Sequence, residues 1–184
     1  MNPDSLARAA AVIRAGGVVA YPVEACFGLG CDPRRPAALR RILRMKRRRR
    51  AQGMILIADR ADRLAPFVDT FEVACREAML ASWPGRHTWL LPAAPRASRW
   101  LRGDHDSIAV RVTAHRGAAE LCRLARTALV STSANRSGRR MLRSAAAVRR
   151  EFGDEVDWVV DGRIGGAGAP SVIRDGRSGE LLRG

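Results

Sequence analysis

The fold is decided by residues 17–36, GVVAYPVEACFGLGCDPRRP, where an apolar run, a polar segment and a helix start follow one another. Val18 to Pro22 predicts a short buried strand. Pro36 is typical of the first residue of a helix, which we expect to run into a basic block at residues 46–50. Between them, Glu24 and Gly28-Leu29-Gly30 predict a turn. This turn is either a plain connection or a place where small residues let a ligand approach the backbone. Ligands of α/β sheets bind where strands end, so we look for the site there.

Strands and helices alternate in the same way on both sides of this stretch. We predict further strands at 54–58, 88–91, 107–113, 128–132 and 158–160, and a C-terminal hairpin that pairs 171–174 with 180–183. We predict a helix that is capped at Asp4–Ser5 and ends at Gly16, and further helices over 71–83, 117–125 and 144–152. No linker or repeat interrupts this pattern. The sequence therefore predicts an α/β fold in which residues 1–184 form one domain, with helices packed on a mixed sheet.

Composition points to a cytoplasmic protein that attracts polyanions. The formal net charge is +15, which favours binding of nucleotides or tRNA, although arginine-rich codon usage would also produce a solvated basic surface. No apolar run is long enough for a membrane span, and the first residues lack a signal peptide. The four cysteines and three histidines follow no zinc-ligand spacing, so we expect no protein metal site.

Lys46 is the only lysine of the chain, and every other basic side chain is an arginine. It opens the run Lys46-Arg47-Arg48. Cations at the end of a helix are often only solvated. The alternative is that they clamp a triphosphate, because neutralising phosphate charge is the main task of a nucleotidyl-transfer site.

Two other polar clusters lie at predicted strand ends. Ser131-Thr132-Ser133-Ala134-Asn135 follows an apolar strand and indicates either a turn or groups that bind phosphate oxygens. Arg111 lies on the polar face of the 107–113 strand. An arginine in this position is usually exposed to solvent. The alternative is that it forms a bidentate pair with a carboxylate. Residues 170–175, PSVIRD, form the fourth cluster together with this arginine.

In this order and spacing the clusters resemble the YrdC-like family of threonylcarbamoyl-AMP synthases, in its short single-domain bacterial branch. The matching runs are VVAYPVEACFGLGCDP, LRMKRR, GMILIA, SWPG, SIAVRVT, STSANRSG and PSVIRD. They are spread along the chain, so the resemblance extends over nearly all of it from Val18 to Gly184. The family signature K-x-R…S-x-N falls on Lys46, Arg48, Ser133 and Asn135.

The resemblance implies a twisted mixed sheet around a positively charged concave cleft. It implies that L-threonine, bicarbonate and ATP give threonylcarbamoyl-AMP and pyrophosphate, with Mg²⁺ carried by the triphosphate. The product would pass to a downstream t6A transferase complex that modifies position 37 of certain tRNAs. The implied catalytic residues are the four of the signature. They would bind ATP together with Ser131 and Arg174, and the implied threonine-binding residues are Tyr21, Val23, Arg111, Thr132 and Val172.

Two positions depart from the family pattern, since Val23 and Val172 stand where the family usually has threonine. Valine keeps the shape and loses a hydroxyl, which weakens discrimination between threonine and its isosteres. Two alternatives stay open at this stage. One is a related carbamoyl-adenylate enzyme, similar to a domain of hydrogenase maturation factors. The other is a non-catalytic or weakly active paralogue that binds RNA, and weak tRNA contact is also compatible with catalysis.

Overall fold

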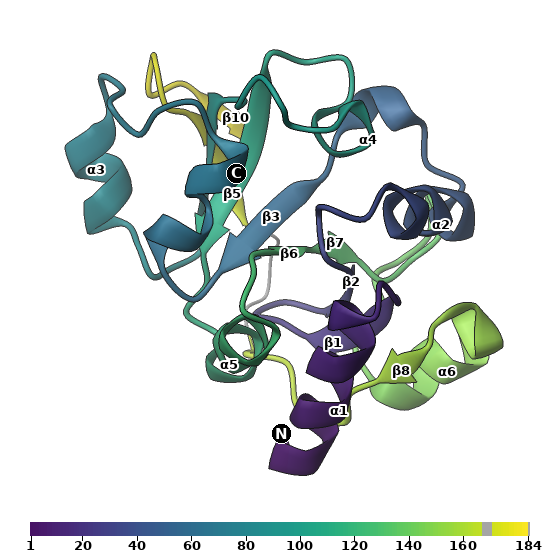
Figure 1. Cartoon of the computed structure of the whole chain (residues 1–184). Helices are drawn as coiled ribbons and strands as arrows, with labels where there is room; N and C mark the ends of the chain where they lie inside the picture. The colour runs from purple at the N-terminus through teal and green to yellow at the C-terminus, as the bar shows by residue number, and fades with distance from the viewer. Residues whose placement is uncertain (167–170, 184) are drawn as a thin grey trace.

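The strands form two β-sheets instead of the single mixed sheet that the sequence predicts (Figure 1). The computed structural model describes residues 1–166 and 171–183, so Pro170 of the PSVIRD run and the C-terminal Gly184 lie outside the described residues. The first sheet has the order β7-β2-β1-β8, with β1 Val19–Pro22, β2 Phe27–Gly30, β7 Thr132–Ser133 and β8 Trp158–Val159. The second has the order β10-β9-β4-β5-β3-β6, with β3 Ile55–Ala58, β4 His87–Pro92, β5 Ser107–Val112, β6 Leu129–Val130, β9 Val172–Asp175 and β10 Leu181–Arg183.

Both sheets are mixed, and the helices cover them. In the first sheet β1 pairs antiparallel with β2 and parallel with β8; in the second β5 pairs parallel with β3 and antiparallel with β4. The helices are α1 Pro3–Arg14, α2 Pro36–Lys46, α3 Arg76–Ala81, α4 Arg99–Arg102, α5 Arg116–Ala125 and α6 Ala145–Phe152. Short 3₁₀ turns occupy Arg50–Gln52, Ala61–Arg63, Ala65–Phe67 and Gly153–Glu155. In the described part of the chain no helix is long and apolar enough to span a membrane.

Strand β2 corrects the predicted turn at Gly28-Leu29-Gly30. Glycine is depleted in strands, so the segment has no strand signal of its own. A Cβ on Gly30 would lie 2.5 Å from the Val130 carbonyl oxygen and 2.7 Å from Cε1 of Tyr21. The glycine therefore leaves room for the fully buried Tyr21 ring, whose hydroxyl donates to the same carbonyl at 3.1 Å.

The predicted strand 128–132 is divided between the two sheets. Its first half is β6, where Val130 pairs with Leu56 of β3, and Ser133 of β7 pairs with Gly28 of β2. Between the halves, the Ser131 N–H donates to the Ile55 carbonyl at 2.8 Å. The chain thus crosses from one sheet to the other at Ser131, which places Ser131 between the sheets and Thr132–Ser133 at the edge of the first sheet.

Two helix boundaries also differ from the predicted ones. The α1 cap is Asn2, whose side chain accepts from the Asp4 N–H at 2.9 Å, and not Asp4 or Ser5. Helix α3 is much shorter than the predicted 71–83. The Cys75 N–H donates to the Gly176 carbonyl at 3.1 Å, so this segment is tied to the turn after β9 before the helix begins.

Candidate active site

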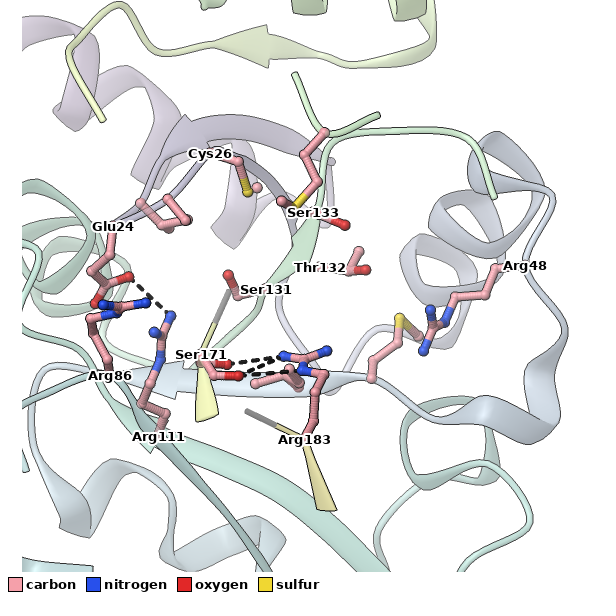
Figure 2. A pocket seen from close by; sticks show the side chains of 16 residues that line it. Glu24, Cys26, Arg48, Arg86, Arg111, Ser131, Thr132, Ser133, Ser171 and Arg183 are labelled. Carbon is pink, nitrogen blue, oxygen red and sulfur yellow. Dashed lines mark hydrogen bonds and ion pairs between the residues drawn. The ribbon is translucent and has the colours of Figure 1, made fainter. Parts of the chain in front are cut away.

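The pocket that holds most of the predicted polar residues lies where the chain crosses between the sheets. Its space, including the open mouth, is about 820 Å³. Figure 2 shows Glu24, Arg86 and Arg111 gathered at one end and Arg48 at the other. The lining residues are Val23, Glu24, Ala25, Cys26, Gly28, Arg48, Met54, Ile55, Arg86, Arg111, Ser131, Thr132, Ser133, Met141, Ser171 and Arg183.

Arg111 is buried at 6% exposure and lines this pocket, so the solvent-facing alternative for it is wrong. Its Nη2 lies 3.1 Å from Oε2 of Glu24, a buried ion pair drawn as a dashed line in Figure 2. The other carboxylate oxygen, Oε1, accepts from the Thr113 hydroxyl at 2.7 Å. Within the described residues, the Arg111 Nε is buried without a hydrogen-bond partner. The protein therefore leaves this guanidinium incompletely paired.

Arg48 and Arg183 form a second cationic group. Arg48 follows α2 and donates to the Gly53 carbonyl at 3.0 Å, while its Nε is buried without a partner. Arg183 of β10 donates to the carbonyl of Ser171 at 3.0 Å and to its hydroxyl at 3.2 Å (Figure 2). Burial and the charge of Arg183 lower the pKa of Arg48, and burial and the charge of Arg111 lower the pKa of Arg183. Mutual repulsion of neighbouring cations is relieved by a bound anion.

The four signature residues meet at the end of α2, but they do not all face the pocket. Lys46 is 2% exposed and its Nζ donates to the carbonyl of Asn135 at 2.8 Å, to Oδ1 of Asn135 at 3.3 Å and to the carbonyl of Ser133. Burial, and then the charge of Arg48, lower the Lys46 pKa to about 8. Asn135 donates to the Arg136 and Arg139 carbonyls and accepts from the Ser133 hydroxyl at 2.6 Å. In this arrangement Lys46 and Asn135 hold the loop, and Arg48 and Ser133 line the pocket.

The remaining predicted residues divide in the same way. Val23, Ser131 and Thr132 line the pocket together with Arg111. Tyr21 of β1 is fully buried, and its hydroxyl donates to the Val130 carbonyl of β6. Val172 and Arg174 lie on β9, and neither is among the lining residues. Arg174 instead donates to the Gly179 carbonyl at 2.9 Å, in the turn before β10.

Sequence reasoning missed Arg86 and Arg183 as lining residues. Arg86 comes directly before β4 and Arg183 ends β10. Neither lies in one of the quoted runs, and nothing distinguishes either from the chain's other arginines. Only the pairing of β9 with β4 and of β10 with β9 indicates that both ends reach one site.

Metal ligands do not gather here. Within residues 1–166 and 171–183, no group of three or more His, Cys, Asp and Glu side chains could hold a metal ion. A cation in this pocket would have to be held mainly by its ligand.

Residues 11–184 match the model of the Sua5/YciO/YrdC family, which carries the description "Telomere recombination", and the chain belongs to this family. Among its relatives are proteins named threonylcarbamoyl-AMP synthase. The one from Halorhodospira halophila is 54% identical and the alignment covers 99% of this chain and 95% of the relative. The one from Thiobacillus denitrificans is also 54% identical, over 94% and 92% of the two chains.

Solved structures agree with this assignment. P. abyssi Sua5 complexed with L-threonine is 32% identical with a TM-score of 0.87, over 97% of this chain and 53% of that one. An engineered variant of the same P. abyssi protein gives a TM-score of 0.91 at 30% identity, over 100% and 57%. The chain thus spans about half the length of these archaeal proteins. E. coli YciO, at 23% identity and a TM-score of 0.80, supports the fold alone.

Proposed function

We propose that the chain is a threonylcarbamoyl-AMP synthase, which joins L-threonine, bicarbonate and ATP and releases pyrophosphate. The observation that carries the proposal is the cationic pocket, in which the buried Arg111, the half-buried Arg48 and the more exposed Arg183 surround the Ser131–Ser133 crossing. Relatives of this name align over nearly the whole chain at 54% identity, and they support the same reaction.

The amino acid would occupy the end of the pocket at Arg111. Its carboxylate would pair with the part of the guanidinium that Glu24 does not use, and Val23 and Thr132 would line the side chain. The solved complex of P. abyssi Sua5 with L-threonine supports threonine as the substrate. Val23 contributes shape without a hydroxyl, so the selectivity of this pocket rests on the remaining polar groups.

ATP would lie toward Arg48 and Arg183. These two arginines also line a neighbouring hollow whose walls are mostly apolar and which would suit the base. Its apolar walls are formed by Met54, Ile55, Leu90, Leu101, Ile108, Ala109, Ile173 and Leu182. The phosphates would then lie between the two hollows, where the arginines and the Ser133 hydroxyl converge.

The chemistry requires positioning and charge stabilisation, without a covalent enzyme intermediate. A carbamate formed on the threonine nitrogen attacks the α-phosphorus of ATP through an oxygen, and the bond to pyrophosphate breaks. Arg48 and Arg183 would neutralise the charge that grows on the leaving group. Lys46 would act by holding the Ser133–Asn135 loop in place. Magnesium would arrive on the triphosphate, since the pocket offers it few carboxylates.

The product is a mixed anhydride, which would serve a t6A transferase complex acting on tRNA in the cytoplasm. A tRNA contact is also part of the proposal. A shallow hollow beside Arg48 is lined by Trp100 and by five further arginines, Arg40, Arg44, Arg47, Arg49 and Arg50. A basic surface with one aromatic side chain favours weak, salt-sensitive binding of a phosphate backbone.

Pyrophosphate release tests the proposal. The protein is incubated with MgATP, bicarbonate and L-threonine, and each component is omitted in turn. We expect release to require all three. Release that persists without threonine would exclude the proposed reaction. Salt-sensitive tRNA binding without any release would favour the RNA-binding alternative.

A further inference from the structure

Glu24 is the one acidic side chain that lines the pocket among the residues that the structure describes. It follows β1 and is 8% exposed. One carboxylate oxygen, Oε1, is fixed by the hydroxyl of Thr113 at 2.7 Å. The other, Oε2, lies 3.1 Å from Nη2 of Arg111, yet in the described part of the chain no hydrogen bond reaches it. The carboxylate is thus anchored on one side and incompletely paired on the other.

Its partner is incomplete in a matching way, because Nε of Arg111 is also buried without a hydrogen bond. Buried polar groups normally have a partner, so two unsatisfied atoms in one ion pair indicate a place for a ligand. A carboxylate beside a guanidinium is complementary to a molecule that carries both a carboxylate and an ammonium group. An α-amino acid has this charge pattern over a short distance.

The pocket offers few other groups to which a proton can be transferred. Its arginines stay protonated, and its hydroxyls do not accept a proton at neutral pH. Burial raises the pKa of the Cys26 thiol, which keeps it protonated. Lys46 is not among the lining side chains, and its Nζ is occupied by three acceptors. Glu24 is the remaining protein group that can take up a proton there.

We propose that Glu24 binds the ammonium group of the amino acid and accepts the proton that this group must lose before it reacts. The inference rests on the proposed function. The substrate carboxylate shares Arg111, which frees Oε2 for the ammonium. A proton passes from nitrogen to Oε2, and the nitrogen lone pair forms a bond to the carbon of bicarbonate. A carbon–oxygen bond breaks, and the departing hydroxide takes the second proton from nitrogen and leaves as water, giving the carbamate.

Binding to two ligands tests the first part of this proposal. L-threonine and 3-hydroxybutanoate, which lacks the amino group, are titrated into the wild-type protein and into Glu24→Gln by calorimetry. We expect the wild type to prefer threonine by about tenfold or more, as a charge-assisted hydrogen bond provides. In Glu24→Gln the preference should fall below about threefold, with unchanged or tighter binding of 3-hydroxybutanoate, since a repelling carboxylate is gone.

A merely structural role gives a different result. If Glu24 only holds Arg111 in place, both ligands lose affinity in parallel, and that outcome overturns the proposal. An unchanged preference for threonine overturns it as well. Glu120→Gln is the matched control, because Glu120 pairs with Arg123 on the exposed face of α5 and should change neither affinity.

Turnover tests the second part. Loss of a positioned proton acceptor should lower kcat for pyrophosphate release by about 100-fold or more, with a smaller change in KM for ATP. A kcat within about threefold of wild type would overturn the proposal. If Glu24→Gln does not fold, Glu24→Asp keeps the charge one methylene further back. It should then retain the preference for threonine and lose turnover, and wild-type turnover would contradict the proposal. Threonine-selective binding without pyrophosphate release in the wild type would refute the proposed function and leave the ammonium site standing.

Discussion

Replacing Lys46 by methionine, which has similar length and no charge, tests how the signature lysine acts. Lys46 is 2% exposed as a residue, and its ammonium donates to the carbonyls of Ser133 and Asn135 and to the Asn135 side chain. In the variant the Asn135 carbonyl loses the Lys46 donor, whereas the Ser133 carbonyl still accepts from the Asn135 N–H at 3.0 Å and the Asn135 Oδ1 still accepts from the Ser133 hydroxyl at 2.6 Å. We therefore expect the loop that carries Ser133 to lose its position at the edge of the pocket.

Two opposing effects set the expected stability of Lys46→Met. Each carbonyl left without a donor costs about 1–3 kcal/mol. Against this, lowering the pKa from 10.5 to about 8 corresponds to about 3 kcal/mol that disfavours the charged ammonium in the folded protein, and the variant removes that cost. The two effects largely offset each other, so the stability of the variant should lie within about 2 kcal/mol of the wild type, small beside the roughly 5–15 kcal/mol of a typical domain. The variant should therefore fold at 25 °C.

The sign of the pH dependence follows from the same pKa. Between about pH 8 and 10.5 the unfolded chain still holds the proton that folded Lys46 has lost. The free energy of unfolding of the wild type should therefore rise relative to Lys46→Met across this interval, and the desolvation cost is fully present below it.

The assay combines urea unfolding with pyrophosphate release, and Arg150→Met, which removes one exposed charge from α6, is the control. We expect kcat/KM of Lys46→Met to fall by about 10²–10³, the loss typical of a displaced transition-state donor. Unchanged turnover would refute the reasoning.

Four further predictions follow from the geometry. Arg183→Ala should raise KM for ATP by about tenfold with little change in urea unfolding, and an unchanged KM would remove Arg183 from the phosphate site. Gly30→Ala places a Cβ 2.5 Å from the Val130 carbonyl oxygen, so urea unfolding should show a loss of about 1–3 kcal/mol, and wild-type stability would contradict the close approach. Val23→Thr should lower KM for threonine, and a higher KM would mean that the pocket is fitted to valine. kcat/KM for ATP should fall above about pH 8, as Lys46 of the ligand-free protein loses its proton. The fall in kcat should begin at higher pH, because the phosphates of bound ATP favour the charged ammonium. A flat profile of kcat/KM up to about pH 10 would exclude this dependence.

Much of the fold could be predicted because apolar periodicity and caps are local signals. The start of α2 at Pro36, the strand at 107–112 and the C-terminal hairpin lie where the sequence places them. Strand β2 could not be found locally, since its two glycines are explained by Tyr21 and Ser131 across the sheet. The division of 128–132 between two sheets depends on which strands β6 and β7 meet, and pairing is a property of the whole chain.

The site was predictable to a similar extent. The clusters at Lys46, Ser131–Asn135 and Arg111 do come together, because each follows or occupies a strand or helix that the sequence reveals. Which members line the pocket depends on packing: Tyr21 and Arg174, which the resemblance implies as binding residues, are not among the lining residues. Arg183 reaches the pocket only through the pairing of β10 with β9.

Direct detection of the product tests the central claim. The protein is supplied with MgATP, L-threonine and isotopically labelled bicarbonate, and the nucleotides are analysed by mass spectrometry, with Lys46→Met and a reaction without threonine as controls. The proposed function predicts labelled threonylcarbamoyl-AMP in equal amount to the released pyrophosphate, and none in the reaction without threonine. Pyrophosphate release accompanied by unlabelled AMP alone would contradict it.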